Sequence, residues 1–487
     1  MFDVIRPSLF ISPLSSLSPL SSLSFPHESD IRNQMLRSTF QMNSNSFSRR
    51  NFLKKSIVGA SLAPVLAANF EFPFIRSARA GEPPPSEKIR LGLIGCGGMG
   101  RGDLECFFLY PEVDCAVICD VDDAQIAKGV EICQNKRGKK PETTKDFRHV
   151  LDRKDVDMVL IATPDHWHAL PAVLACQAGK DVYVEKPLAK TIDEGRAMLD
   201  ASKKHNRVVQ MGSQWRSCKH ILEAAELIHS GKLGKISLVR GWAYLDWLPS
   251  IGNPPDATPP PGVDYDMWLG PSPARPFNPN RFHFNFRWYW DYAGGLMTDW
   301  GVHLINIMLM GMGNDWPKSA ASSGGKFVFN DSSETPDSQM TIYEFPDYML
   351  VWEHKAGLNN GLNGRSWGVE WNGTEGTIIA NDSGWEIISE RKQANLDSAK
   401  KPGSPDPRPA HVRNFLDCMK SRRQPVLNLE LGHHLSAIAH LGNIAYRTGR
   451  KVYWDADKEK ITNDREADKL VGASYRKPWK LPYTKRA

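Results

Sequence analysis

The sequence has few of the features that mark disulfide-stabilised, metal-binding or membrane-spanning proteins. Its eight cysteines form no Cys-x-x-Cys pair and no Cys/His spacing of the kind that binds a metal. Most of them lie in apolar runs, so we expect small buried side chains and no disulfide framework. The apolar run at residues 56–70 is short and rich in Ala, Ser and Gly, which argues against a membrane span. The sequence also contains no internal repeat.

Most of the chain also has no excess of positively or negatively charged residues. The 487 residues include 61 Lys and Arg against 55 Asp and Glu, a formal charge of +6. Residues 1–80 contain nine of the basic and four of the acidic residues, which leaves 52 against 51 in the remainder. That balance gives no electrostatic reason to expect binding to nucleic acid or to an anionic membrane. Length and composition are those of a globular protein with two or three domains.

The first 80 residues divide into two segments. Residues 1–41 are rich in Ser, Pro and Leu, and we expect a disordered or mis-called extension there. Residues 42–80 resemble a twin-arginine signal peptide, with Ser-Arg-Arg-Asn-Phe-Leu-Lys at 48–54 ahead of the apolar run. Ala-Arg-Ala at 78–80 supplies a cleavage site near Ala80. We therefore expect export to the periplasm or another extracytoplasmic space by the twin-arginine machinery; the alternative is a basic disordered arm.

The clearest motif is a glycine-rich turn that follows a short apolar run at residues 91–94. It reads Gly95-Cys-Gly97-Gly-Met-Gly100, which is Gly-x-Gly-x-x-Gly between an expected strand and an expected helix. Gly95 permits the tight turn, Gly97 leaves room for a pyrophosphate, and Gly100 lets the helix pack closely on the strand. Free N–H groups at the helix start then hold the phosphates. The alternative is a glycine turn in another kind of α/β protein.

An acidic residue in the right place strengthens this interpretation. Residues 113–120 are expected to form the second strand, and Asp120 ends it twenty positions after Gly100. A carboxylate there accepts hydrogen bonds from an adenosine ribose and repels a 2′-phosphate. The sequence therefore predicts NAD as the cofactor and disfavours NADP.

The remaining pattern predicts an α/β protein with two folded domains. In residues 86–212, short apolar strands alternate with helices, which is typical of a doubly wound parallel Rossmann sheet. The expected strands are 89–94, 115–120, 157–162, 181–184 and 208–212, and the expected helices are 100–109, 123–135, 167–178 and 191–205. Residues 213–480 contain alternating, β-rich runs typical of a mainly antiparallel sheet, with helices after it, in an α+β domain. The expected strands there are 236–245, 339–345, 350–354, 367–371, 377–380, 385–389 and 451–455, with helices at 411–421 and 429–448.

Two strand ends in the first domain are polar, and ligands of doubly wound sheets bind beyond such ends. One is Thr163-Pro164 with His168 shortly after it; the other is Glu185-Lys186-Pro187. A lysine that leaves a buried strand towards the cofactor can hold a substrate hydroxyl and help to move its proton. The alternative for Lys186 is an ordinary surface lysine at a strand–loop junction.

A third polar cluster ends in an acid and a histidine. If the chain is helical from Gly295, Asp299 and His303 are at i and i+4 and share one face. A carboxylate beside an imidazole orients the ring and raises its basicity, as a general base requires. No third ligand suggests a metal, so we expect none; a purely structural pair is the alternative. The roles of His433, His434 and Arg413 stay open.

These motifs together resemble the Gfo/Idh/MocA oxidoreductases (glucose–fructose oxidoreductase and inositol dehydrogenase). The likeness covers about residues 88–455. Its features are the Gly95–Gly100 turn, Asp120, Thr163-Pro164 with His168, Glu185-Lys186-Pro187, Gly294-Gly295 and Asp299-x-x-x-His303. The leader and the aromatic segment from residue 287 resemble an exported subgroup from bacteria that degrade glycans.

The resemblance implies the roles of individual residues. Lys186, Asp299 and His303 would act on a hydroxyl of a sugar or polyol. The implied cofactor residues are Gly95, Gly97, Gly98, Met99, Gly100, Asp120, Thr163, Pro164, His168, Glu185 and Lys186. The implied substrate residues are Trp288, Tyr289, Trp290 and Arg216. It also implies a tightly bound NAD. Residues 213–480 would be the substrate and oligomerisation domain, with an open sheet through which a dimer or tetramer forms.

Three functions are consistent with these features. The first is an NAD(P)-dependent dehydrogenase that transfers hydride between a sugar, polyol or glycoside carbinol and nicotinamide. The second is an NAD-dependent glycosidase that oxidises C3, eliminates the glycosidic bond and returns the hydride, although glycosidases of this family differ around the Gly-Gly segment. The third is a non-catalytic glycan-binding protein, which intact Lys186, Asp299 and His303 argue against.

Overall fold

The computed structural model describes residues 87–390, 398–472 and 474–484. The segments expected at 1–41 and 42–80, with the cleavage site near Ala80, lie outside the described residues. No helix among the described residues is long and apolar enough to cross a membrane.

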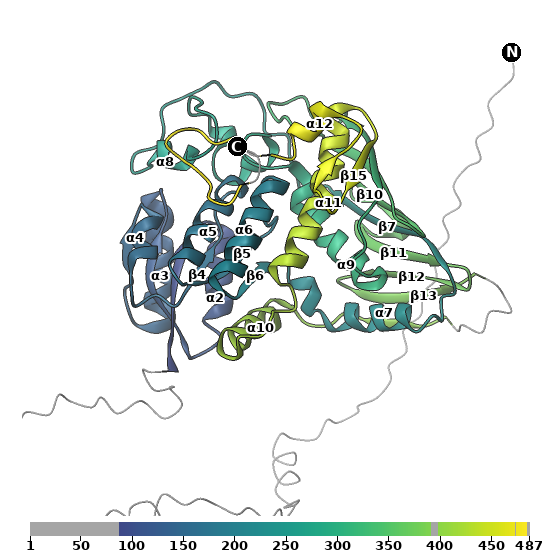
Figure 1. Ribbon diagram of the computed structural model, residues 1–487, viewed down its shortest axis with the longest axis horizontal. Helices are drawn as coiled ribbons and strands as arrows, with labels where there is room; N and C mark the ends of the chain where they lie inside the picture. Colours follow the sequence, from purple (N-terminus) through teal and green to yellow (C-terminus); the bar gives the residue numbers. More distant parts are fainter. Residues whose placement is uncertain (1–86, 391–397, 473, 485–487) are drawn as a thin grey trace, which may run out of the picture. The chain divides into compact units, whose positions relative to one another are not determined.

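Six parallel strands form the first sheet in the order β3-β2-β1-β4-β5-β6 (Figure 1). The strands are β1 Ile89–Ile94, β2 Val113–Cys119, β3 Glu142–Thr144, β4 Met158–Ile161, β5 Asp181–Glu185 and β6 Val209–Gly212. The strand order reverses between β1 and β4, which opens a ligand crevice at their carboxyl ends. The predicted parallel, doubly wound sheet is confirmed.

Helices connect these strands. They are α2 Gly98–Phe107, α3 Asp123–Arg137, α4 Phe147–Asp152, α5 Ala169–Gln177 and α6 Ile192–His205. Of these, α3, α4 and α6 begin at a side-chain cap. The side chain of Thr191 accepts from the backbone N–H of Glu194, and Glu194 accepts from that of Thr191, a capping box that fixes the start of α6. The sequence analysis missed β3 and α4 because both are short and β3 is polar (Glu-Thr-Thr).

A second sheet of ten strands has the order β14-β13-β12-β11-β7-β10-β9-β8-β15-β16. Its strands are β7 Ile236–Leu245, β8 Ser319–Gly325, β9 Ser338–Glu344, β10 Met349–Ala356, β11 Trp367–Gly373, β12 Gly376–Asn381, β13 Gly384–Ser389, β14 Lys400–Pro402, β15 Val452–Asp455 and β16 Lys460–Ile461. Apart from the parallel β7–β10 pair, the neighbours are antiparallel. The mainly antiparallel sheet is therefore confirmed, and the missed β8 (Ser-Ala-Ala-Ser-Ser-Gly-Gly) lacks apolar alternation.

Helices separate the two sheets and carry part of the site. They are α7 Lys219–His229, α9 Val302–Met312, α10 Arg408–Ser421 and α11 Leu429–Thr448, with the shorter α8 Tyr265–Leu269 and α12 Arg465–Lys469. Helix α9 packs on β7 and β11, and α11 packs on β8 on one side and on α6 and β6 on the other (Figure 1). Both helices are almost entirely buried, which matches their apolar sequences.

The long segment after β7 packs onto the nucleotide domain. The N–H of Asp264 donates to the carbonyl of Val121 at 2.9 Å, and Nζ of Lys145 donates to the carbonyl of Gly262 at 2.7 Å. Nε2 of His283 lies 2.8 Å from a carboxylate oxygen of Asp122. The segment therefore closes over the loop after β2, close to Asp120.

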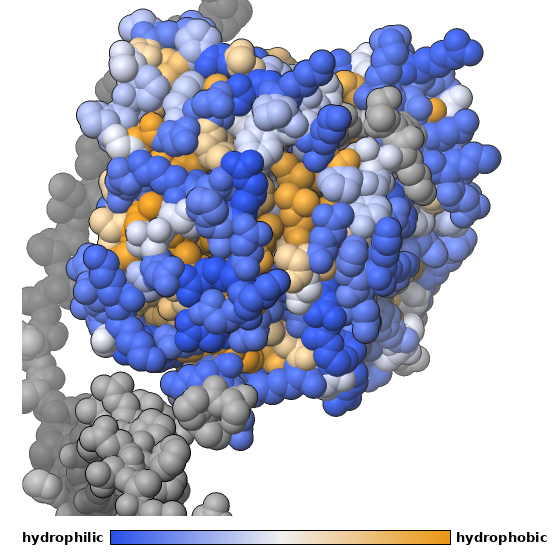
Figure 2. All heavy atoms as spheres, turned by 60° about the vertical axis from the view of Figure 1, so that its left-hand side comes forward, coloured by the Kyte–Doolittle hydropathy of each residue, from blue (hydrophilic) through white to orange (hydrophobic). Residues whose placement is uncertain are grey.

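The surface is mostly polar, and the cysteines are inside. Figure 2 shows one face on which hydrophilic residues predominate and apolar side chains reach the surface between them. All eight cysteines are buried and free. They act as small core side chains, as their apolar surroundings in the sequence predict.

Candidate active site

The glycine turn has the shape that a dinucleotide needs. Gly95 has φ +90°, and a Cβ there would lie 2.7 Å from the backbone of Ala162. A Cβ on Gly100 would lie 2.1 Å from the carbonyl oxygen of Gly95, so the helix can approach the strand only with glycine. At Gly97 and Gly98 a Cβ would meet nothing within 4 Å. The open space at the start of α2 fits a pyrophosphate.

Asp120 ends β2 beside this turn. Its carboxylate accepts from the N–H of Cys96 at 2.6 Å and from that of Asp122 at 3.0 Å. Each oxygen keeps a second lone pair, which can accept from a ribose hydroxyl. Burial raises the pKa of Asp120, while these two N–H groups act in the opposite direction. At the end of β4, Oγ1 of Thr163 is buried without a partner among the described residues, so it can also take a ligand hydrogen bond.

His168 is buried between the two polar strand ends with both ring nitrogens bonded within the chain, and its role at the cofactor stays a prediction. It is 1% exposed, and its ring nitrogens lie 2.7 Å from the carbonyl of Pro187 and 2.9 Å from that of Thr163. Burial lowers the pKa of His168 to about 4. The ring joins the two polar strand ends and fixes their spacing.

Glu185 is buried at the end of β5, and its contact with the cofactor stays a prediction. Its carboxyl packs under Gly212, where a Cβ would lie 1.9 Å from Oε1, and it faces Asp103 of α2. Burial, and then the charge of Asp103, raise the pKa of Glu185. Burial likewise raises the pKa of Asp103 to about 7. The two carboxyls form a buried acidic pair behind Lys186.

Lys186 meets Asp299 at the end of β5. Its Nζ lies 2.5 Å from Oδ1 of Asp299, and Nε of Arg287 donates to the same oxygen at 3.2 Å. Burial opposes ionisation, but Lys186 and Arg287 hold the pKa of the Asp299 carboxyl well below its usual range. Two cations therefore share one carboxylate at the carboxyl end of the parallel sheet.

The expected contact between Asp299 and His303 is replaced by another. Nδ1 of His303 lies 2.9 Å from Oγ of Ser213, and Nδ2 of Asn306 donates to that hydroxyl oxygen at 3.3 Å. Nε of Arg216 donates to Oδ1 of Asn306 at 2.9 Å. Ser213, and not Asp299, therefore orients the imidazole.

A π-helical turn explains this correction. Residues Met297–Gly301 form the π turn and α9 begins at Val302, so the i, i+4 stacking of a regular helix does not hold between Asp299 and His303. Burial, followed by the positive charge of Lys186, lowers the pKa of His303 to about 3. The expected rise in basicity is therefore wrong, and the ring is neutral at physiological pH.

The aromatic residues expected to bind substrate have different positions. Tyr289 is 2% exposed and its hydroxyl pairs with Oγ of Ser332 at 2.8 Å, so it is a core residue and the substrate assignment is wrong. Trp288 lines a cavity of about 200 Å³ that also contains Trp247 and Phe284. Trp290 lines another cavity, of about 310 Å³. Only Trp288 borders an aromatic pocket beside Arg287.

Sequence reasoning missed two charged residues that face Lys186. Arg287 was noted only as part of an aromatic run, and no spacing rule marks it. Asp165 is 7% exposed, and burial raises its pKa to about 7 against the opposing effect of Arg287 and Lys186. Its position directly after Thr163-Pro164, at a polar strand end, was an available signal.

The residues left open on the late helices have structural partners. Nε2 of His433 lies 2.6 Å from Glu459, and Nε2 of His434 lies 3.1 Å from the carbonyl of Asp315. Arg413 pairs with Glu112 at 2.6 Å. These contacts hold α10 and α11 in place, away from Lys186.

Two family profiles match most of the folded chain. The profile described as an oxidoreductase family with an NAD-binding Rossmann fold matches residues 89–213. The profile of the C-terminal alpha/beta domain of the same family matches residues 216–324 and 391–481. The chain belongs to the Gfo/Idh/MocA oxidoreductase family. Its first sheet is thus the NAD-binding Rossmann domain of that family.

Curated Gfo/Idh/MocA relatives include both glycosidases and a dehydrogenase. A "Glycosyl hydrolase family 109 protein 1" of Shewanella sp. (strain MR-4) is 31% identical over 39% of this chain and 44% of its own length. An "Alpha-N-acetylgalactosaminidase" of Shewanella oneidensis is 30% identical over the same shares. A "Levoglucosan dehydrogenase" of Pseudarthrobacter phenanthrenivorans is 32% identical over 34% of this chain and 44% of its own. The chain spans less than half the length of these relatives.

Solved structures share the Gfo/Idh/MocA fold at lower identity. Levoglucosan dehydrogenase in complex with NADH and levoglucosan has a TM-score of 0.58 and 20% identity, over 75% of this chain and 99% of its own. GenD2 from gentamicin A biosynthesis in complex with NAD also has a TM-score of 0.58 and 20% identity, over 78% and 100%. At such identities the likeness shows the fold.

Proposed function

We propose that this protein is an NAD-dependent oxidoreductase that transfers a hydride between a carbinol carbon of a sugar, polyol or glycoside and the nicotinamide. The observation that carries the proposal is the convergence of Lys186, Asp299 and His303 at the carboxyl end of a parallel NAD-binding sheet. The named dehydrogenase relative supports a carbohydrate substrate. NAD, when bound, supplies the acceptor or donor of the hydride.

The side chains supply the proton chemistry. His303 is neutral, and when Nδ1–H donates to Ser213, Nε2 has a free lone pair for the hydroxyl proton. Lys186, held by Asp299, donates to the substrate oxygen and stabilises the charge that develops there. Asp299 therefore positions Lys186 in this scheme, in place of the imidazole that the sequence suggested.

The cofactor residues that we propose are the glycine turn, Asp120 and Thr163. Asp120 favours an unmodified ribose over a 2′-phosphate, so NADP is disfavoured. Contacts between the segment after β7 and the loop after β2 favour slow release, which supports a tightly bound NAD.

A glycosidase that uses NAD transiently is the second candidate. Glycosidase relatives at 30–31% identity favour it. Oxidation at C3 of the sugar would acidify the C2–H, loss of that proton would expel the aglycone, and addition of water with return of the hydride would restore the sugar. This sequence consumes one water and leaves NAD unchanged.

One assay separates the candidates. The purified, NAD-loaded protein is incubated with a panel of sugars, polyols and aryl glycosides. Net absorbance of NADH supports the dehydrogenase, and release of aglycone without NADH supports the glycosidase. Sugar binding with neither product would support the non-catalytic glycan-binding alternative and contradict both.

We further propose that the protein is exported through the twin-arginine route and acts outside the cytoplasm. The run of residues 48–54 and the Ala-Arg-Ala at 78–80 support this. Residues 1–86 fused to a folded fluorescent reporter should send it to the periplasm. Replacement of Arg49 and Arg50 by lysine should retain it in the cytoplasm; export of the double variant would contradict the proposal.

We also propose that residues 86–212 and 213–480 are separate domains and that the second forms a homo-oligomer. Met340 and Ile342 of β9 and Met349 of β10 are 41–49% exposed on the second sheet, which supports an apolar contact between copies. Light scattering should give a dimer or tetramer. Ile342→Glu should lower the mass to that of a monomer, and a monomeric wild type would contradict the proposal.

A further inference from the structure

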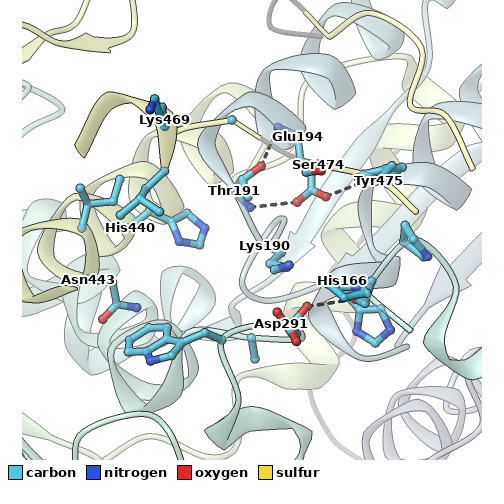
Figure 3. A pocket seen from close by; sticks show the side chains of 18 of the residues that line it. His166, Lys190, Thr191, Glu194, Asp291, His440, Asn443, Lys469, Ser474 and Tyr475 are labelled. Carbon is cyan, nitrogen blue, oxygen red and sulfur yellow. Dashed lines mark hydrogen bonds between the residues drawn. The ribbon is translucent and has the colours of Figure 1, made fainter. Parts of the chain in front are cut away.

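The cavity of about 310 Å³ lies apart from the proposed active site. It is bordered by α6, α11 and the loops around residues 166, 271–273 and 290–293 (Figure 3). None of the glycine-turn residues, Asp120, Lys186, Asp299 or His303 lines it. Its volume is at the lower end of small-molecule sites, which span about 300–1,000 Å³. A monosaccharide-sized ligand suits such a space.

Two cations line this cavity beyond ion-pair distance of its carboxylates. Neither Lys190 nor Arg447 makes an ion pair or a hydrogen bond with a described residue. The guanidinium of Arg447 lies 5.0 Å from the ring centre of Trp290. Burial lowers the pKa of both Lys190 and Arg447. The charges of Glu194 and Asp291 oppose this effect on Lys190, and that of Asp291 opposes it on Arg447. Figure 3 shows Lys190 near the middle of the cavity, with the carboxylate of Asp291 directly below it in this view.

The two carboxylates of the cavity are already engaged. Glu194 accepts from the N–H of Thr191 at 2.9 Å and from the hydroxyl of Tyr475 at 2.8 Å. Asp291 lies 2.6 Å from Nε of Arg275. Both carboxylates therefore have direct partners elsewhere, whereas Lys190 and Arg447 have no direct ion pair.

Two residues that line the cavity each hold a buried acceptor atom without a donor. Nε2 of His166 lies 3.0 Å from the carbonyl of Trp268, so Nε2 carries the proton and Nδ1 is an acceptor. Nδ2 of Asn443 donates to the carbonyl of Gly294 at 2.7 Å, which leaves Oδ1 as an acceptor. His166 is 1% exposed and Asn443 4%, and neither Nδ1 nor Oδ1 has a partner among the described residues. Unpaired buried acceptors are costly and call for hydroxyl donors.

We propose that this cavity binds a small polyhydroxylated anion of the sugar-acid class. Its carboxylate would pair with Lys190 and Arg447, and its hydroxyls would donate to Nδ1 of His166 and Oδ1 of Asn443. The indole of Trp290 offers an apolar face to the carbon skeleton. A simple anion would leave the acceptors unpaired, and a neutral sugar would leave the cations unpaired.

Helix α11 contributes through one face. His440, Asn443, Ile444 and Arg447 follow the i, i+3, i+4, i+7 spacing, so all four side chains reach the cavity. Nε2 of His440 donates to the carbonyl of Ala189, which fixes the helix against the chain beside Lys190. The site is therefore built from rigid elements.

Calorimetry on the NAD-loaded protein tests the proposal. The probes are D-gluconate and D-glucuronate, with acetate, inorganic phosphate, D-glucitol and D-glucose 6-phosphate as comparisons. We expect saturable binding of a sugar acid, weakened about tenfold or more in Lys190→Gln and in Arg447→Gln, because each removes a charge-assisted hydrogen bond. The exposed Lys219→Gln makes the same change of charge elsewhere and should leave affinity unchanged.

Each outcome decides the matter. Absence of saturable sugar-acid binding at millimolar concentrations, or equal affinity in wild type and both cavity variants, would overturn the proposal. Equally tight binding of D-glucitol would contradict the role of the anion, and equally tight binding of acetate or phosphate would contradict that of the hydroxyls. Preferential binding of D-glucose 6-phosphate would overturn the sugar-acid class and show that the two cations hold a phosphate. Unchanged NAD affinity and melting temperature show that the variants fold, and Lys190→Met repeats the test with another side chain.

Discussion

Lys186 and Asp299 are 113 residues apart in the sequence, yet Nζ of the lysine lies 2.5 Å from Oδ1 of Asp299 and 3.2 Å from its backbone carbonyl. The pair joins the end of β5 to the π turn before α9. It is largely buried, with the lysine side chain 9% exposed. A lysine fixed in this way presents its remaining donor to a single place, which is what stabilisation of a developing alkoxide requires.

Lys186→Ala should remove turnover and spare cofactor binding. The change leaves the glycine turn and Asp120, which we propose to bind NAD, untouched. Arg287 still pairs with the carboxylate of Asp299 in the variant. We expect kcat/KM to fall about a hundredfold or more, with a similar Kd for NAD. Initial rates on the best substrate of the panel and fluorescence titration of NAD measure the two effects. Lys219→Ala is the matched exposed control, and activity retained by Lys186→Ala would refute the assigned role.

Ser213→Ala should impair the action of the His303 imidazole as a base without weakening substrate binding. The variant loses the partner of Nδ1 of His303, so the ring loses its orientation and its tautomer preference. We expect kcat to fall about tenfold with little change in KM, because the substrate contacts remain. Ser217→Ala is a close control, because it removes another serine hydroxyl that lies 2.9 Å from Nδ1 of a histidine, in that case His411. Equal losses in both variants would assign Ser213 a merely structural role.

Asp120→Ala should weaken the binding of NAD and reduce the preference for NAD over NADP. The change removes an acceptor for the ribose and a charge that repels a 2′-phosphate. It also removes the partner of the Cys96 N–H, so the glycine turn loses support. We expect the Kd for NAD to rise about tenfold or more, and that for NADP to change less. An unchanged ratio of the two dissociation constants would contradict this reading of Asp120.

The buried pair of Asp103 and Glu185 predicts a fall in stability with rising pH. Burial raises the pKa of Asp103 to about 7 from 3.8, so the folded state holds a proton that the unfolded state loses first. This contribution is complete below about pH 4 and is lost as pH rises through about 7. Between pH 5 and 8 the melting temperature of the wild type should therefore fall relative to that of Asp103→Asn, which lacks this titration, while the buried histidines contribute equally to both proteins. The exposed Asp382→Asn should keep a constant difference from the wild type; the same constant difference in Asp103→Asn would refute the prediction.

The sequence by itself determined the features that depend on neighbouring residues. The turn from Gly95 to Gly100, the acid at the end of β2 and the alternation of strands and helices rest on local backbone geometry and short-range periodicity. They led to the doubly wound sheet and to the NAD-binding domain. Lys186 was found in the same way, because a charged residue directly after a buried strand is expected at the carboxyl edge of the sheet, where ligands bind.

Only the tertiary structure decided which side chains meet. The partner of Asp299 is Lys186 because a π turn rotates it away from His303. The partner of His303 is Ser213, which directly follows β6 and is 90 residues away. Tyr289 and Trp290 are adjacent in sequence, yet one is in the core and the other lines a separate cavity. Such pairings follow from the packing of whole helices and sheets. No pattern confined to one stretch of chain contains that information.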